Sequence, residues 1–245
     1  MKRLLRYKQK IEKFILDTLF PITCLGCQKQ SDQWICEHCL KKISLKKDQI
    51  CPICEKIITP KGEICFSCHK KNSIDGLLVC TSYKEKIISR AVGYFKYRFV
   101  KRLSIPLSKI MLEASRNFDL RLPDIIIPIP LHPHRLRWRG FNQSQLLAQY
   151  LGKNLTPGFD IPILENNLIR KYYTSPQMKI KNYKERQRNI QNAFTVLQKE
   201  NIKNKNILLV DDIATTGSTL FECAKILKQS GAKKVFGIVI ARQKV

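Results

Sequence analysis

Residues 207–220 have the sequence ILLVDDIATTGSTL, and this stretch decides the fold. It begins with an apolar run typical of a buried parallel strand, and the run ends in two adjacent carboxylates, Asp211 and Asp212. A turn of small residues follows and opens a helix. The backbone N–H groups of such a turn can approach a phosphate closely, and the helix N-terminus adds the positive end of its dipole. The stretch therefore predicts an α/β fold with a phosphate site at the carboxyl end of a strand.

The two carboxylates indicate that the ligand has a second group besides the phosphate, because their negative charge does not favour a phosphate. Asp211 and Asp212 suit the vicinal hydroxyls of a ribose, bound directly or through a Mg2+ ion. Donors for a 5-phosphate come from the turn, which consists of Ala214, Thr215, Thr216, Gly217, Ser218 and Thr219. The Gly-Lys-Ser/Thr of a Walker loop is absent. A ribose 5-phosphate site is expected, and the alternative is an ordinary strand–turn–helix with two solvated acids.

Alternating strands and helices extend this pattern over residues 76–245. Apolar runs predict strands at 77–83, 124–130, 165–171, 205–212 and 230–242. Helical spacing predicts helices at 142–154, capped by Asn142, and at 218–229, with two more in 85–116 divided at Pro106. This order predicts an α/β domain with a mainly parallel sheet.

Eight of the ten cysteines form four Cys-x-x-Cys pairs, namely Cys24/Cys27, Cys36/Cys39, Cys51/Cys54 and Cys65/Cys68. Such a turn aims two thiolates at one metal, and two turns complete a tetrahedral zinc site. The pattern predicts two closed, structural Zn2+ sites, against the alternative of a redox or disulfide role. Sequential pairing is the simplest arrangement, and a cross-braced pairing stays open. The other two cysteines, Cys80 and Cys223, have the apolar neighbours typical of core residues.

These patterns divide the chain into an N-terminal amphipathic helix at 1–20, a double zinc ribbon at 21–72 and the α/β domain at 76–245. Charged residues interrupt the apolar positions of the first part, so it lacks the unbroken apolar core of a signal peptide. The sequence has no run of about 18 apolar residues, so no membrane insertion is expected. A cytoplasmic protein is predicted.

Residues 127–144, IPIPLHPHRLRWRGFNQS, follow a predicted strand. They are expected at the carboxyl edge of the sheet, where ligands bind in open α/β folds. Arg135, Arg137 and Arg139 alternate along this segment and are expected on one side of a loop, where their guanidinium groups suit pyrophosphate. The alternative is a basic, solvated loop.

A long polar and basic segment follows the predicted strand at 165–171 and is a candidate lid over an anionic substrate. Its candidate contacts are Arg170, Thr174, Gln177, Arg186 and Asn189. The alternative is a solvated connecting helix.

The chain carries 45 Lys+Arg against 19 Asp+Glu, a formal net charge of +26. Residues 76–245 hold 30 basic and 11 acidic residues, more than one small anionic ligand requires. Residues 94–102, YFKYRFVKR, combine aromatic and basic side chains that suit single-stranded DNA. The alternatives are core packing of Phe95 and Phe99, which is favoured for these aromatic rings, and a lysine-rich composition that reflects the genome.

All of these features, in this order, resemble the ComF family, which is linked to DNA uptake in bacterial competence. The resemblance covers nearly the whole chain. It includes LFP (19–21), the zinc cysteines, FKY (95–97), PIPLHPHR (128–135), RGFNQS (139–144), the polar series 170–194 and VDDIATTGST (210–219). The last of these is similar to the segment of type I phosphoribosyltransferases that binds 5-phosphoribosyl 1-pyrophosphate (PRPP).

The resemblance implies a type I phosphoribosyltransferase-like domain that uses PRPP and Mg2+, joined to a double zinc ribbon. It assigns Asp211 and Asp212 to the ribose hydroxyls, the turn at 214–219 to the 5-phosphate, and Arg135 and Arg139 to the pyrophosphate. These two acids and two arginines are the candidate catalytic residues. The acceptor is not implied, and neither is turnover.

The implied role is the handling of incoming single-stranded DNA, with a competence helicase or other competence proteins as partners. Two alternatives stay open. In the first, the chain is a non-catalytic scaffold or sensor that binds DNA or a helicase through its zinc module. In the second, it is an ordinary salvage transferase for a nucleobase.

Overall fold

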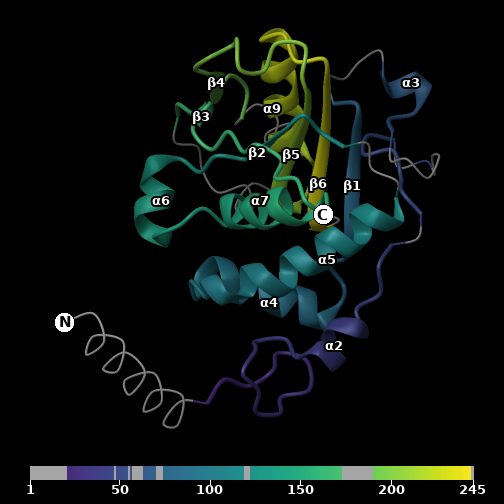
Figure 1. The fold of residues 1–245 in the computed structure, drawn as a ribbon, viewed down its shortest axis with the longest axis vertical. Helices are drawn as coiled ribbons and strands as arrows, with labels where there is room; N and C mark the ends of the chain where they lie inside the picture. The colour runs from purple at the N-terminus through teal and green to yellow at the C-terminus, as the bar shows by residue number, and fades with distance from the viewer. Residues whose placement is uncertain are drawn as a thin grey trace.

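The computed structural model describes residues 21–46, 48–54, 56, 63–69, 74–118, 122–172 and 190–243. At its centre lies a sheet in the order β1 (Gly76–Ser82), β6 (Lys234–Arg242), β5 (Asn206–Ala214) and β2 (Ile125–Pro128). All neighbouring strands of this sheet are parallel. Figure 1 shows them side by side, with β2 at one edge and β1 at the other. The predicted α/β fold with a mainly parallel sheet is confirmed.

The structure explains why apolar and polar residues do not alternate along strand β5. Ile207 and Leu209 belong to one buried cluster, on one face of the sheet. Leu208 and Val210 belong to a second buried cluster, on the other face. A strand that is covered on both faces is apolar throughout. The carboxylates of Asp211 and Asp212 follow where this apolar run ends.

Helices provide the cover on both faces of the sheet. Residues of α4 (Lys86–Tyr97), α5 (Ser104–Asn117) and α7 (Gln143–Asn154) contribute to one cluster, and residues of α9 (Ser218–Gln229) contribute to the other. Figure 1 shows α4 and α5 crossing below the strands as drawn. The cap predicted for α7 is confirmed, because the side chain of Asn142 accepts a hydrogen bond from the N–H of Ser144 at 3.1 Å.

The two helices predicted within 85–116 are present, but the position predicted for the break is wrong. The chain leaves α4 after Tyr97 and passes through a short 3-10 turn, η1 (Lys101–Leu103), before α5 begins. Pro106 lies buried in the first turn of α5. The first N–H groups of a helix have no partner within it, so a proline there removes no hydrogen bond.

Residues Pro133–Arg139 form a helix, α6, where the sequence analysis predicted a loop. His132 caps this helix, because its Nδ1 accepts a hydrogen bond from the N–H of His134 at 3.2 Å. Proline occupies the first position, and Gly140 ends the helix with a φ of +73°. These signals are present in the sequence, but the segment is too short for an apolar periodicity to reveal a helix.

The strand predicted at 165–171 exists as β3 (Leu168–Arg170), but it does not join the main sheet. It pairs antiparallel with β4 (Phe194–Val196) to form a separate two-stranded sheet. The remaining predicted strands and the helix at 218–229 are confirmed with small shifts at their ends.

The cysteine-rich part contains the short helices α2 (Glu37–Lys41) and α3 (Phe66–His69), and the segment between them docks on the edge strand β1. The hydroxyl of Thr81 donates to the carbonyl of Ser44 at 2.7 Å. The side chain of Gln49 accepts from the N–H of Val79 at 3.0 Å and donates to its carbonyl at 3.3 Å. The helix predicted at 1–20 lies outside the described residues. None of the helices in the described ranges has the length and apolar character needed to cross a bilayer.

Candidate functional site

A cavity of about 600 Å3 opens beside the carboxyl end of β5. Its wall combines residues of α4, α6, α7 and β3 with the end of β5 and the turn that follows. Asp211, Asp212, Arg135, Arg139 and Arg170 all line it. The cavity therefore brings together the candidate acids and the candidate arginines that lie far apart in the sequence.

Each carboxylate of the Asp pair is held by a partner from a different helix. The hydroxyl of Ser144, at the start of α7, donates to Asp211 Oδ1 at 2.8 Å. The ammonium of Lys96, near the end of α4, lies 2.8 Å from Asp212 Oδ1. The sequence analysis assigned no role to Ser144 or Lys96, because nothing in their local sequence links them to the pair.

The environment changes the proton affinity of Asp211 and of its neighbour Lys96. Burial and the neighbouring charge of Asp212 raise the pKa of Asp211 to about 7, although Lys96 and Ser144 act in the opposite direction. Burial alone would lower the pKa of Lys96, but the charge and hydrogen bond of Asp212 outweigh it and raise that pKa. Lys96 is therefore a cation that faces the carboxylate of Asp212.

The turn after β5 ends in a glycine with a left-handed backbone conformation. Gly217 adopts a φ of +82° and precedes the first residue of α9. A Cβ atom at this position would lie 2.8 Å from Cζ of Phe221, so both the backbone and the space favour glycine. The hydroxyls of Thr216 and Ser218 lie 2.6 Å apart, whereas Thr215 and Thr219 line the cavity.

Two of the three arginines of α6 line the cavity. Arg135 and Arg139 line the cavity, but Arg137 does not. Residues four apart lie on the same face of a helix, whereas a residue two positions away points elsewhere. The prediction that all three arginines share one side is wrong because it assumed an extended loop.

Arg139 is held in place by a chain of hydrogen bonds that reaches α4. Its Nη1 donates to Gln143 Oε1 at 3.0 Å, and Gln143 Nε2 donates to the carbonyl of Phe95 at 3.1 Å. The Nε of Arg139 is buried and has no hydrogen-bond partner within the described part of the chain. A buried guanidinium donor beside a cavity suits an anionic ligand.

Of the candidate lid residues, Arg170 lies in the described part of the chain. It is at the end of β3 and lines the cavity. Its guanidinium carbon lies 5.4 Å from the centre of the Phe194 ring on β4. The other candidates, Thr174, Gln177, Arg186 and Asn189, lie outside the described residues.

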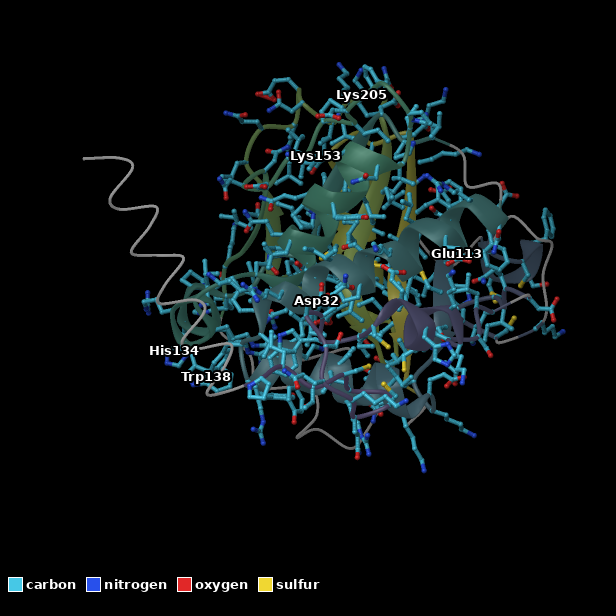
Figure 2. The ribbon with its side chains drawn as sticks, turned by 60° about the horizontal axis from the view of Figure 1, so that its bottom comes forward. Asp32, Glu113, His134, Trp138, Lys153 and Lys205 are labelled. Carbon is cyan, nitrogen blue, oxygen red and sulfur yellow. The ribbon has the colours of Figure 1, made fainter. Side chains whose placement is uncertain are left out.

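Aromatic side chains surround the mouth of the cavity. Tyr97 and Trp138 line it and are 48% and 58% exposed. Phe99 is 37% exposed and meets the Trp138 ring edge-on, with ring centres 5.3 Å apart. Core packing was favoured for both phenylalanines, but it holds only for Phe95, since the break after α4 leaves Phe99 at the surface. Figure 2 shows Trp138 and His134 next to each other at one end of the molecule.

The eight cysteines of the four pairs form two groups in sequential order. The sulfur atoms of Cys24, Cys27, Cys36 and Cys39 lie within 4.8 Å of one another, and so do those of Cys51, Cys54, Cys65 and Cys68. The N–H groups of Gly26 and Cys36 both donate to Cys24 Sγ at 3.4 Å. Burial alone would raise the pKa of Cys24, but backbone N–H donors lower it to about 6. Four clustered sulfurs with a stabilised thiolate fit tetrahedral Zn2+, and the structure favours sequential over cross-braced pairing.

The two remaining cysteines are core residues, as predicted. Cys80 lies in β1 and Cys223 in α9, and both are fully buried.

Two models of known protein families match this chain. Residues 15–69 match the model of the double zinc ribbon domain, and residues 146–244 match that of the phosphoribosyl transferase domain. A purine phosphoribosyltransferase structure from Pyrococcus horikoshii Ot3 is 20% identical, with a TM-score of 0.31 over 61% of this chain and 88% of that chain.

Curated relatives match over most of their length. "Competence protein F" of Haemophilus influenzae is 31% identical over 88% of this chain and 95% of its own. "DNA utilization protein YhgH" of Escherichia coli K12 is 30% identical over 82% and 87%. "Competence protein ComFC" of Bacillus subtilis is 26% identical over 82% and 80%. With its double zinc ribbon, its phosphoribosyltransferase-type domain and these relatives, the chain belongs to the ComF family.

Proposed function

We propose that this protein binds PRPP in the cavity beside β5, with Mg2+ on the pyrophosphate, and acts as a phosphoribosyltransferase-type protein in natural competence. One observation carries the proposal. The Asp pair and the Thr-rich turn at the end of β5 face Arg135 and Arg139 of α6 across one cavity. The cavity thus combines carboxylates that can accept hydrogen bonds from ribose hydroxyls, a turn that can donate to a phosphate, and guanidinium groups that can bind a pyrophosphate. A phosphorylated ribose with a pyrophosphate group requires this combination.

Each part of the site has a role in this proposal. Asp211 and Asp212 receive the ribose hydroxyls, and the turn from Ala214 to Thr219 receives the 5-phosphate. Arg135 and Arg139 bind the pyrophosphate, and the buried Nε of Arg139 supplies an unpaired donor within the described part of the chain. Bound Mg2+ supplies further charge neutralisation to the pyrophosphate. Arg170 contacts the ligand from the cavity wall, and Thr174, Gln177, Arg186 and Asn189 remain candidate lid residues of this proposal.

The reaction class is displacement at the anomeric carbon. An acceptor forms a new bond to this carbon while the bond to the pyrophosphate oxygen breaks, and the pyrophosphate leaves with the bonding electrons. Arg135 and Arg139 stabilise the charge that develops on the leaving group.

The PRPP site is tested by calorimetric titration of the zinc-loaded protein with PRPP and Mg2+. We expect the double substitution Asp211→Asn and Asp212→Asn to weaken binding at least about tenfold, or roughly 1.4 kcal/mol, because both ribose acceptors change. Asp160→Asn removes an exposed carboxylate and serves as the control. Unchanged PRPP binding in the double variant would show that the site is wrongly assigned.

Turnover is tested separately by measuring pyrophosphate release from PRPP with nucleobases or single-stranded DNA as acceptors. Release that is lost in the Asp pair variant supports a transferase. PRPP binding without release supports the alternative, a non-catalytic scaffold or sensor that binds DNA or a helicase through the zinc module.

The competence role is supported by the names of the relatives, which include "Competence protein F" and "DNA utilization protein YhgH". In this proposal the protein works in the cytoplasm on incoming DNA, with a helicase or other competence proteins as partners. Complementation of a deletion strain measures this role. We expect the wild-type gene to restore transformation and the Asp pair variant to fail at equal protein level.

Contact with single-stranded DNA is supported by the aromatic side chains at the mouth of the cavity. Tyr97, Phe99 and Trp138 are partly exposed, and the guanidinium of Arg98 and the ammonium of Lys101 lie in the same stretch of sequence as Tyr97 and Phe99. Unpaired bases stack on such rings while cations follow the phosphates. Anisotropy titrations of a labelled oligonucleotide should show affinity that falls with salt and falls further in Trp138→Ala. Salt-insensitive binding would contradict this contact.

A further inference from the structure

The end of strand β6 contacts the turn that follows β5. The two strands are parallel neighbours (Figure 1), and Arg242 at the end of β6 pairs with Ala214, where β5 ends. The N–H of Gln243 donates to the carbonyl of Ala214 at 2.9 Å. The Nε of Arg242 donates to the carbonyl of Thr215 at 3.1 Å. The end of β6 therefore binds the first two carbonyls of the turn.

The direction of the Thr215 carbonyl matters, because a carbonyl oxygen that faces an anion repels it. Thr215 lines the cavity, whereas Arg242 does not belong to the cavity lining. The carbonyl of Thr215 is therefore directed toward a group behind the turn, as seen from the cavity. In a planar trans peptide, the carbonyl and the N–H point in opposite directions. The N–H of Thr216 shares this peptide, so it is directed toward the cavity side.

The peptide between Thr215 and Thr216 is held by a side chain. By contrast, the carbonyl of Gly217 accepts the N–H of Phe221 at 2.9 Å, a backbone contact that a change of side chain does not remove. The carbonyl of Thr215 accepts from the guanidinium of Arg242, so its orientation depends on this side chain. The bond between them is partly buried, which limits the competition from water.

We infer that Arg242 is a positioning residue for the phosphate site: its Nε holds the Thr215 carbonyl away from the ligand and thereby presents the N–H of Thr216 to the 5-phosphate. This inference rests on the proposed function, and it adds to that site a residue from outside the cavity lining. The hydrogen-bond donor at Nε is what the turn requires in this scheme, and the charge of the guanidinium is secondary.

Calorimetric titration of the zinc-loaded full chain with ribose 5-phosphate tests this role. Arg242→Met removes the donor, so we expect binding to weaken at least about tenfold. Arg242→Gln places an amide nitrogen where Nε was, without the charge, so its affinity should stay within about threefold of the wild type. Lys234→Met is the matched control, because it removes a positive charge at the opposite end of β6, and it should bind as the wild type does.

Two further measurements separate this role from a general loss of structure. Pyrophosphate with Mg2+, which the proposed function assigns to Arg135 and Arg139, should bind to Arg242→Met within about twofold of its wild-type affinity. In amide NMR spectra, ribose 5-phosphate should move the Thr216 N–H resonance downfield in the wild type and in Arg242→Gln, but not in Arg242→Met. Arg242→Ala also lacks the donor and takes the place of Arg242→Met if that variant does not fold.

An unchanged affinity for ribose 5-phosphate in folded Arg242→Met would overturn the inference. Equal losses in Arg242→Met and Arg242→Gln would also overturn it, because the charge and not the donor would then be decisive. An equal loss of pyrophosphate binding would do the same, because Arg242 would then support the whole cavity. If the wild type does not bind ribose 5-phosphate, the ribose phosphate site itself is contradicted, and with it the proposed function.

Discussion

The pKa of Asp211 makes the stability of this site depend on pH at the scale of a single residue. The folded protein raises this pKa from its ordinary value of 3.8 to about 7, chiefly through burial. A raised pKa means that the folded state binds more protons than the unfolded state between these two values. The contribution of Asp211 to stability is therefore fully present below about pH 4 and is lost as the pH rises to about 7.

Asp211→Asn should remove this dependence, because an amide stays neutral. We expect the free energy of unfolding of the wild type, relative to Asp211→Asn, to fall between pH 5 and pH 7 by at most about 1.4 kcal/mol per pH unit. It should be level above about pH 8. Urea unfolding of both proteins at a series of pH values measures this difference, and a difference that rises with pH would contradict the raised pKa.

Gly217 provides a second prediction at this scale. Gly217→Ala places a Cβ atom 2.8 Å from the Phe221 ring, at a backbone φ of +82°. We expect a loss of about 1–3 kcal/mol in stability and a weaker affinity for ribose 5-phosphate. Gly158→Ala is the control, because its φ of +77° imposes the same backbone strain with no atom within 4 Å of the added Cβ. Equal losses in the two variants would show that the contact with Phe221 has no effect.

At the scale of elements, helix α6 determines which arginines face the ligand. Arg135 and Arg139 lie one helical turn apart and line the cavity, whereas Arg137 lies between them in sequence and outside the cavity lining. We expect Arg139→Ala and Arg135→Ala each to weaken pyrophosphate binding at least about tenfold. Arg137→Ala should change it less than twofold. Isothermal titration with pyrophosphate and Mg2+ measures the three affinities, and equal losses would indicate a general charge effect instead of a directed site.

The helical structure of α6 could not be predicted from the sequence. Its cap, its first proline and its final glycine are recognisable only once a helix is considered. An alternation of arginines and apolar residues over so short a segment suits a strand, a loop or a helix equally well. The longer elements were predictable because the periodic apolar positions of α9 and the continuous apolar run of β5 extend over more residues.

At the scale of the whole molecule, the zinc ribbons and the α/β domain form a continuous structure. Gln49 bonds to the backbone of Val79 in β1, and Glu37 of α2 pairs with Lys109 of α5 at 2.7 Å. Loss of zinc should unfold the ribbons, and it should also expose β1 and lower the stability of the sheet.

Removal of zinc by a chelator under reducing conditions should therefore lower the melting temperature of the entire protein, as measured by calorimetry. Gln49→Ala should weaken this coupling, because it removes both hydrogen bonds to Val79. Lys109→Met, which breaks an exposed ion pair, should have little effect and is the control. If zinc removal leaves the unfolding temperature of the sheet unchanged, this coupling is contradicted.

By itself, the sequence determined the α/β class, the four Cys-x-x-Cys pairs of zinc ligands, and the strand–turn–helix that carries the Asp pair. These features depend on local spacing, since apolar periodicity, Cys-x-x-Cys turns and a small-residue turn act over a few neighbouring residues. The tertiary structure alone decided that Lys96 and Ser144 hold the Asp pair, that Arg137 lies outside the cavity lining and that Phe99 is exposed. Those contacts join helices that are distant in sequence, and they arise because packing against the sheet brings the ends of α4, α6 and α7 to the carboxyl end of β5.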